Sequence, residues 1–209
     1  MHSSALLNLK NFFSIYLKNF NNPKILDFGS QSLSNHVGAK VLLNKMNIKY
    51  EYTGVDIEKG NNVDIVLEDP YSFKEIPDAS YDVIISTSVF EHVEFFWLTY
   101  LEILRILKPN GIFYFNVPSN GDFHRWPQDC WRFYPDSGSA LINWAKRNNY
   151  NPTLLESFVS NQYLECGWND YVSVTLKDEK YLSTFNDRII HTHKKFLNGI
   201  DHNKKLYNL

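Results

Sequence analysis

Two stretches, residues 24–32 (KILDFGSQS) and residues 54–60 (GVDIEKG), decide the fold. Each contains a short apolar run that reaches an aspartate, Asp27 in the first and Asp56 in the second. This pairing predicts two neighbouring parallel strands whose carboxyl ends meet at one edge of a sheet, where open α/β sheets bind their ligands. We therefore expect a tight turn with exposed backbone N–H groups at Gly29, and a carboxylate at Asp56 that binds hydroxyl groups.

Strand and helix patterns alternate along the chain, which predicts an α/β, doubly wound, mostly parallel sheet. Strands are expected at residues 25–28, 50–56, 63–67, 81–86, 112–117, 153–159 and 171–176. Helices are expected within residues 1–22, from Ser34 or Asn35 to 46, at 89–107, and at 137–147 after the N-cap Asp136. The last two strands have no helix between them, so they should pair antiparallel.

The 209 residues are expected to form a single domain. Its parts would include an N-terminal helix (1–22), a long aromatic loop (118–135) and a polar tail (178–209) with a weak helical pattern at 185–197. A loop of this length in a compact domain usually carries function.

Composition excludes several classes of protein. The net charge of −2 gives no electrostatic argument for nucleic acid, which usually requires a basic face, although a local basic patch stays open. No apolar run approaches the ~20 residues of a membrane span. The N-terminal stretch lacks a basic lead and a cleavage site, so no signal peptide is expected. Cys130 and Cys166 are expected to be free thiols in a reducing cytoplasm.

Nucleotide and metal motifs are absent from the sequence. Neither G-x-G-x-x-G nor G-x-x-x-x-G-K-[ST] occurs, which disfavours a nicotinamide dehydrogenase and a pyrophosphate cradle. No metal site is predicted, because the cysteines lack metal spacing. His191 and His193 have no carboxylate or cysteine at a recognisable distance, and are expected in a solvated tail; His36 is expected to have a local role.

Four stretches, in this order, resemble the Rossmann-like (class I) S-adenosylmethionine-dependent methyltransferases. They are KILDFGSQS, GVDIEKG, YDVIISTSVFEHV (81–93) and ILRILKPNGIFYFNVPS (103–119). The resemblance covers residues 24–119. It implies S-adenosylmethionine as cofactor and a seven-stranded sheet whose last strand is inserted antiparallel.

The resemblance also implies which residues contact the cofactor. They are Asp27, Gly29 and Ser30 beside the methionine part, Asp56 on the ribose, Ile57, Asp69, Pro70 and Tyr71 around the adenine, and Ser86 beneath the cofactor. Ser30 and Ser32 stand where the family usually has glycines. A turn or helix-capping role is the alternative for Asp56.

Two regions are candidates for catalysis. His92, in the Glu91-His92 pair expected to open the helix at 89–107, could be a general base. Its alternative role is to cap the helix or to pack under the cofactor. Residues 121–136 (GDFHRWPQDCWRFYPD) supply a second candidate base, His124, and Asp129 to orient it.

The same loop could bind the acceptor. Arg125 and Arg132 could pair with a phosphate or carboxylate, and Trp126 and Tyr134 could stack on a sugar. The alternative is a structural loop with surface ion pairs and core aromatics. The stretch resembles segments of methyltransferases that modify sugars and bacterial surface polysaccharides.

The sequence thus predicts a methyltransferase that O-methylates a sugar or a small phosphorylated metabolite in surface-polysaccharide biosynthesis. A noncatalytic S-adenosylmethionine-binding partner subunit and a methyltransferase acting on another small molecule are the alternatives. The expected partner is a small-molecule acceptor rather than nucleic acid, and a homo-oligomer stays open.

Overall fold

A computed structural model describes residues 2–32, 38–163 and 167–209. Within these ranges a single mixed sheet forms the centre of the molecule. Its strands are β1 (Lys24–Phe28), β2 (Glu51–Asp56), β3 (Ile65–Val66), β4 (Tyr81–Thr87), β5 (Leu107–Pro118), β6 (Thr153–Ser160), β7 (Asp170–Leu176), β8 (Phe196–Asp201) and β9 (Leu206–Tyr207). The α-helices are α1 (Ser3–Tyr16), α2 (Ala39–Lys45), α3 (Phe96–Ile106), α4 (Ser137–Arg147) and α5 (Ile189–Thr192), and the 3-10 turns are η1 (Leu17–Asn19), η2 (Phe90–His92) and η3 (Glu179–Thr184).

The strand order is β3-β2-β1-β4-β5-β7-β6-β8-β9. Strands β1 to β5 pair parallel, and β7 lies antiparallel between β5 and β6. This arrangement confirms the Rossmann-like class and the antiparallel pairing of the two late strands. The reversal of strand order around β1 and β4 creates the switch point at which such sheets bind ligands.

The expected number of seven strands is wrong, because the described sheet has nine. Strand β8 adds antiparallel to the outer edge of β6, and β9 follows it. Phe196 of β8 is buried, with its ring 5.6 Å from that of Phe158. The weak helical pattern at 185–197 therefore yields only the short α5, since the unpaired edge of β6 draws the following segment into the sheet.

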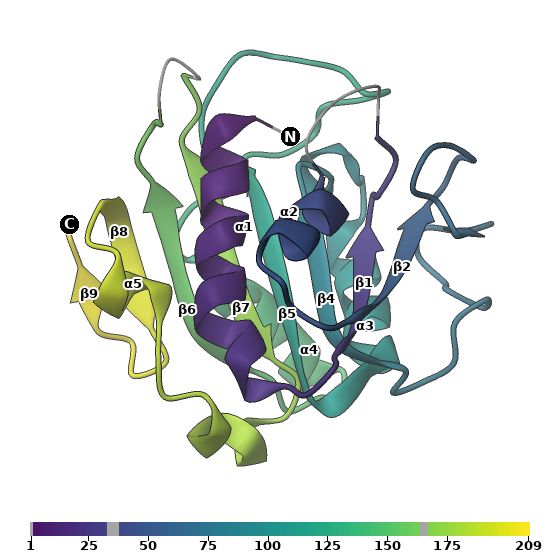
Figure 1. Ribbon diagram of the computed structural model, residues 1–209. Helices are drawn as coiled ribbons and strands as arrows, with labels where there is room; N and C mark the ends of the chain where they lie inside the picture. The colour runs from purple at the N-terminus through teal and green to yellow at the C-terminus, as the bar shows by residue number, and fades with distance from the viewer. Residues whose placement is uncertain (1, 33–37, 164–166) are drawn as a thin grey trace.

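Helices cover both faces of the sheet, with α1 and α2 on one face and α3 and α4 on the other (Figure 1). Helix α1 buries Leu9, Phe12, Phe13 and Tyr16, whose spacing places them on one side of a helix. Phe12 stacks on Tyr114 of β5 at 4.5 Å between centroids. Burying each such side chain stabilises the fold by roughly 1.5–3 kcal/mol.

The long helix expected at 89–107 is divided into η2 and α3, and an extended Val93 follows η2. Loop 118–135 explains the break. The carbonyl of Glu91 accepts hydrogen bonds from the backbone N–H groups of Cys130 and Trp131, at 2.8 and 3.1 Å. The Trp131 indole N–H donates to the carbonyl of Val93 at 3.1 Å. These donors take carbonyls that a continuous helix would use.

Other expected elements differ in length or lie partly outside the described residues. The helix expected from Ser34 or Asn35 to 46 is represented by α2. Ser34, Asn35, His36 and Cys166 lie outside the described residues. Strand β3 is only two residues long. Helix α4 begins and ends as predicted, although the Asp136 side chain makes no capping hydrogen bond.

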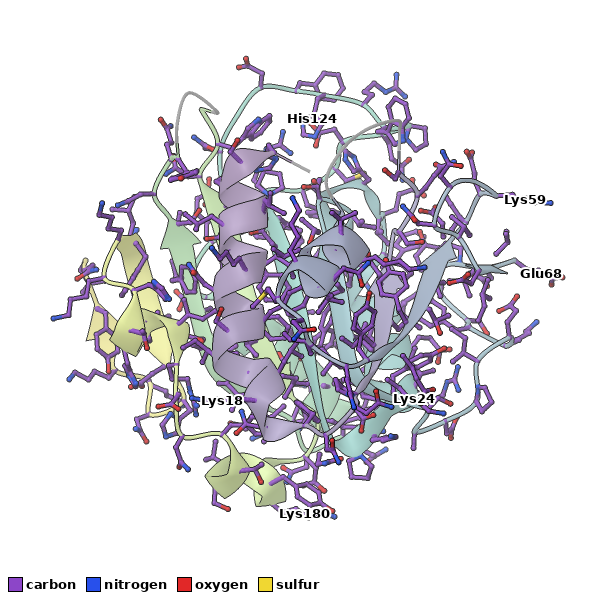
Figure 2. All side chains as sticks on the ribbon, in the orientation of Figure 1. Lys18, Lys24, Lys59, Glu68, His124 and Lys180 are labelled. Carbon is purple, nitrogen blue, oxygen red and sulfur yellow. The ribbon has the colours of Figure 1, made fainter. Side chains whose placement is uncertain are left out.

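The carboxyl ends of the parallel strands form one rim of the sheet. His124, in loop 118–135, lies at this rim, whereas Lys24, which begins β1, lies toward the opposite edge (Figure 2). Among the described residues, no helix combines the length and apolar character required to cross a membrane.

Candidate active site

The turn after β1 is tightly packed. Gly29 has φ +80°, and a Cβ added there would lie 2.1 Å from Cγ2 of Val89. The N–H groups of Gly29 and Ser30 both donate to the carbonyl of Val55, at 2.8 and 3.1 Å. The expectation of exposed N–H groups is therefore wrong at these two residues, because β2 already uses them. The glycine is needed for its conformation and for its close approach to Val89.

Ser30 replaces a glycine without blocking the turn. It is buried, and its hydroxyl donates to the carbonyl of Asn62 at 2.9 Å. The serine therefore ties the first turn to the loop after β2, and its side chain is directed toward that loop.

Two carboxylates end β1 and β2. Asp56 accepts the N–H of Gln31 at 3.0 Å through one oxygen and the N–H of Ile57 at 2.8 Å through the other. Asp27 accepts the Tyr52 phenol at 2.6 Å. Burial raises the pKa of Asp27 to about 6, and the charge of Asp56 adds to this shift. Asp56 is half-buried, and each of its oxygens retains a lone pair for a ligand hydroxyl.

The residues expected around an adenine lie on the same rim, after β2 and β3. Ile57 is 49% exposed, so an apolar side chain is available to a planar ring. Asp69 accepts the N–H of Tyr71 at 2.8 Å, which fixes the turn after β3. The carbonyl of Pro70 accepts the Thr99 hydroxyl at 2.8 Å, which ties this turn to α3.

The carboxyl end of β4 holds several polar atoms without a hydrogen-bond partner in the described part of the chain. They are the hydroxyls of Ser86, Thr87 and Ser88, with the amide nitrogen of Asn116 on β5 close by in register. Buried polar groups are nearly always satisfied, so such a cluster indicates a place for a polar ligand. With the two carboxylates and the exposed Ile57, these groups fit a cofactor that combines an amino acid, a ribose and a purine.

The three residues predicted to act in catalysis lie together. The rings of His92 and His124 are perpendicular, with centroids 5.1 Å apart. Nδ1 of His124 lies 3.5 Å from Oδ2 of Asp129. Burial lowers the pKa of His92, so its imidazole is neutral at neutral pH and can accept a proton. The two histidines and Asp129 lie near the turn after β1. Gly29 in that turn packs against Val89, which is three residues before His92.

Asp129 and Arg132 fix the loop. Both carboxylate oxygens of Asp129 accept from Arg132, at 2.5 and 2.8 Å, and one also accepts the N–H of His124 at 2.8 Å. The hydrogen bonds from Arg132 hold the pKa of Asp129 well below its usual range. Asp129 is thus a charged group that positions His124. Arg132 forms an ion pair with Asp129 inside the loop, which is the structural role given above as the alternative to acceptor binding.

The other residues expected to bind the acceptor lie on the outside of the loop. Arg125, Trp126 and Tyr134 are exposed, Trp126 at 60% and Tyr134 at 62%. Within the described chain, the guanidinium of Arg125 makes one hydrogen bond, to the carbonyl of Pro127 at 3.1 Å. These three side chains are available to an acceptor, whereas Phe133 in the same loop is buried core.

Sequence reasoning missed the role of Glu91 and of the start of α1. Glu91 is 1% exposed, and burial raises its pKa to about 8. Its position beside His92 was a usable signal. In contrast, the buried Asp170 is bound by His2 at 3.0 Å and by Ser4 at 2.6 Å, contacts that span almost the whole chain and leave no local pattern.

Residues 35–115 match the family model of a methyltransferase domain. The matched segment holds Asp56, Asp69, Ser86 and His92, and excludes the turn after Asp27 and loop 118–135. No match to a curated protein was found.

Solved structures share the fold. The 1,6-didemethyltoxoflavin-N1-methyltransferase of Burkholderia thailandensis, solved with S-adenosylhomocysteine, aligns with a TM-score of 0.59 at 14% identity, over 84% of this chain and 79% of that one. The [4+2]-cyclase SpnF aligns with a TM-score of 0.59 at 13% identity, over 84% and 82%. The CMeT domain of the citrinin polyketide synthase aligns with a TM-score of 0.59 at 14% identity over 83% of this chain, which spans about half (52%) of that structure.

At these identities the structures demonstrate a shared fold. The domain match indicates a methyltransferase domain in residues 35–115, which agrees with the fold that these structures share.

Proposed function

We propose that this chain transfers a methyl group from S-adenosylmethionine to a hydroxyl of a sugar or a small phosphorylated metabolite, as a step in surface-polysaccharide synthesis. The observation that carries the proposal is the meeting of His92, His124 and Asp129 at the rim, beside the turn that follows Asp27. We propose a reducing cytoplasm as its setting, where the exposed free thiol of Cys130 is stable.

The proposed cofactor contacts follow the chemistry of the rim. Asp56 would accept hydrogen bonds from the ribose hydroxyls, and Ile57 would pack on the purine. Asp27 and the hydroxyl of Ser86 would contact the amino-acid part. S-adenosylmethionine supplies an electrophilic methyl group on a sulfonium, which is the difficult part of the chemistry.

The proposed work of the protein is to orient the acceptor and to receive its proton. His92 presents Nδ1 to the carbonyl of Gln128, which leaves Nε2 as the proton acceptor. His124, held by Asp129, is the second candidate base. Arg125 would pair with a phosphate or carboxylate of the acceptor, and Trp126 and Tyr134 would cover a sugar ring.

The test is an assay for S-adenosylhomocysteine formation with a panel of sugars, sugar phosphates and matched deoxy analogues. We expect turnover only with acceptors that carry the target hydroxyl, with a lower KM when a phosphate is present. Binding of S-adenosylhomocysteine without turnover on any hydroxyl acceptor would contradict the proposal. That result would favour the noncatalytic subunit or a methyltransferase acting on a different acceptor.

A further inference from the structure

Glu91 is a buried carboxyl group without a side-chain hydrogen bond to any residue that the structure describes. Its side chain is 1% exposed, and neither carboxyl oxygen makes a hydrogen bond to the described residues. Burial of an unpaired carboxyl group is costly whether it is charged or neutral. A group of this kind in a folded protein calls for a ligand, and the two histidines nearby indicate which kind.

The distances bring three ligand atoms into one small volume. Glu91, His92 and His124 each offer one such atom, and the three atoms lie within 4.8 Å of one another. Oε1 of Glu91 is 3.7 Å from Nε2 of His92. In a tetrahedral zinc site with bonds of 2.0–2.2 Å, neighbouring ligand atoms are roughly 3.3 Å apart. Closure by about 1–1.5 Å at the widest pair, within reach of side-chain rotation, would complete the site.

The surroundings of both imidazoles leave one nitrogen of each ring available. Nδ1 of His92 lies against the carbonyl of Gln128, and Nδ1 of His124 lies 3.2 Å from the carbonyl of Asp122. A proton on each Nδ1 would donate to these carbonyls, so both Nε2 lone pairs would be free. Ligation through one nitrogen while the other donates to an oxygen is the usual arrangement of metal-binding histidines.

The charges near the cluster are balanced. Nη2 of Arg132 lies 3.5 Å from Nδ1 of His124, and a lone guanidinium there would repel a cation. Both oxygens of the Asp129 carboxylate are bound to that guanidinium, which makes the pair neutral. Asp170 contributes a further buried negative charge that acts on Glu91.

We propose that Glu91, His92 and His124 form a binding site for a divalent transition-metal ion, Zn²⁺ being the best match, with the remaining coordination position open to an oxygen ligand. Two imidazoles and one carboxylate are a common ligand set for zinc and similar ions. The metal site goes beyond the proposed function, which does not require it. Coordination would occupy the Nε2 lone pairs that base catalysis needs, so a bound ion would inhibit turnover that depends on a histidine base.

The experiment measures metal binding directly on the full chain after treatment with a chelator. Calorimetric titration with Zn²⁺ should give one tight site, and Co²⁺ should give the visible absorption of a four-coordinate complex. Glu91→Gln, which preserves the shape of the side chain and removes the carboxyl group that would bind the metal ion, should weaken binding at least tenfold. The double variant His92→Ala/His124→Ala should abolish it. The control His191→Ala/His193→Ala removes two exposed histidines of the tail and should bind as the wild type does.

Two results would overturn the metal site. One is wild-type protein that binds neither ion at this stoichiometry. The other is binding that Glu91→Gln leaves unchanged and that the tail variant removes. Circular dichroism and the melting temperature of each variant separate a lost site from a lost fold. Because S-adenosylhomocysteine binding is measured separately on the same samples, failure of the metal site and failure of the proposed function are distinguishable.

Discussion

Two sides of the same rim differ in how completely their polar groups are paired. On the β1–β2 side (residues 27–31 and 54–57), the turn amides and both aspartates are joined by hydrogen bonds within the protein. On the β4–β5 side (residues 86–92, 116 and 118–135), three hydroxyls, the Glu91 carboxyl group and the amide nitrogen of Asn116 lack partners in the described chain. The β1–β2 side is therefore already fixed by the protein's own hydrogen bonds. The unpaired groups of the β4–β5 side are expected to find their partners in bound ligands.

The largest effect is expected on the β4–β5 side. The double variant His92→Ala/His124→Ala should lower turnover by the ~10²–10⁴ of a lost general base, while binding of S-adenosylhomocysteine changes little. Initial rates and calorimetry measure the two quantities. The tail variant His191→Ala/His193→Ala is the matched control, and undiminished turnover in the site variant would contradict a role for either histidine as the base.

Gly29→Ala should destabilise the turn after β1, on the β1–β2 side of the rim. The new Cβ would meet Val89 in a backbone conformation with φ +80°, so we expect a loss of roughly 2–5 kcal/mol in the free energy of unfolding. Gly38→Ala is the control, since none of the described residues lies within 4 Å of a Cβ there and its φ is −97°. Urea denaturation measures both, and equal stability of the two variants would show that the turn is not tightly packed.

The buried Asp27 should make stability depend on pH. Its pKa is raised to about 6 in the fold, so the native state binds the proton more tightly than the unfolded chain does. The resulting stabilisation is complete below pH ~4 and is lost as pH rises through about 6, by roughly 1–3 kcal/mol. Asp27→Asn should flatten this part of the profile.

Tyr52→Phe sharpens the Asp27 prediction. The phenol hydrogen bond lowers the pKa of Asp27, so its removal should move the transition to higher pH. Chemical denaturation between pH 4 and pH 8 (about the range that spans both states) measures the shift. A profile identical in wild type, Asp27→Asn and Tyr52→Phe would mean that this carboxyl group titrates normally.

The smallest effect is expected from Asp56→Ala. Loss of the carboxylate should weaken S-adenosylhomocysteine binding by about 10–100-fold, the equivalent of one or two hydrogen bonds to a charged group. The fold should remain, because the hydrogen bonds of the Asp56 carboxylate within the described chain go to two turn amides, those of Gln31 and Ile57. Calorimetry with Asp56→Asn as the conservative control checks this, and unchanged affinity in both would remove Asp56 from the cofactor site.

The same comparison shows what sequence can predict. The β1–β2 side was predictable because its aspartates lie in short apolar strands, with the glycine directly after the first strand, and the pattern of these strands fixes their place in the sheet. The β4–β5 side was predictable only in part. His92 and His124 were identified separately, but no spacing indicated that they would meet, or that the buried Glu91 would lie beside them. Metal motifs are recognised by residues at short, fixed spacings in the sequence. Glu91 and His92 come together with His124 only because loop 118–135 folds back onto η2, so no such spacing exists.

The edge of the sheet illustrates a second limit. The sequence showed only a weak helical pattern at 185–197 and no strand in the tail, whereas the chain forms β8 from Phe196 onward, with Phe196 and Ile200 buried where β8 pairs with β6. Likewise, the sequence suggested that Arg132 binds an anion of the acceptor. In the structure its guanidinium is paired with the carboxylate of Asp129, three residues earlier. Tertiary pairing overrides local pattern in both cases.

The most direct test of the account is a crystal structure of the chain with S-adenosylhomocysteine. The account predicts the ribose hydroxyls at Asp56, the adenine on Ile57, and the sulfur directed toward His92 and His124. Nucleoside density away from this rim, or a sulfur that faces away from both histidines, would contradict it.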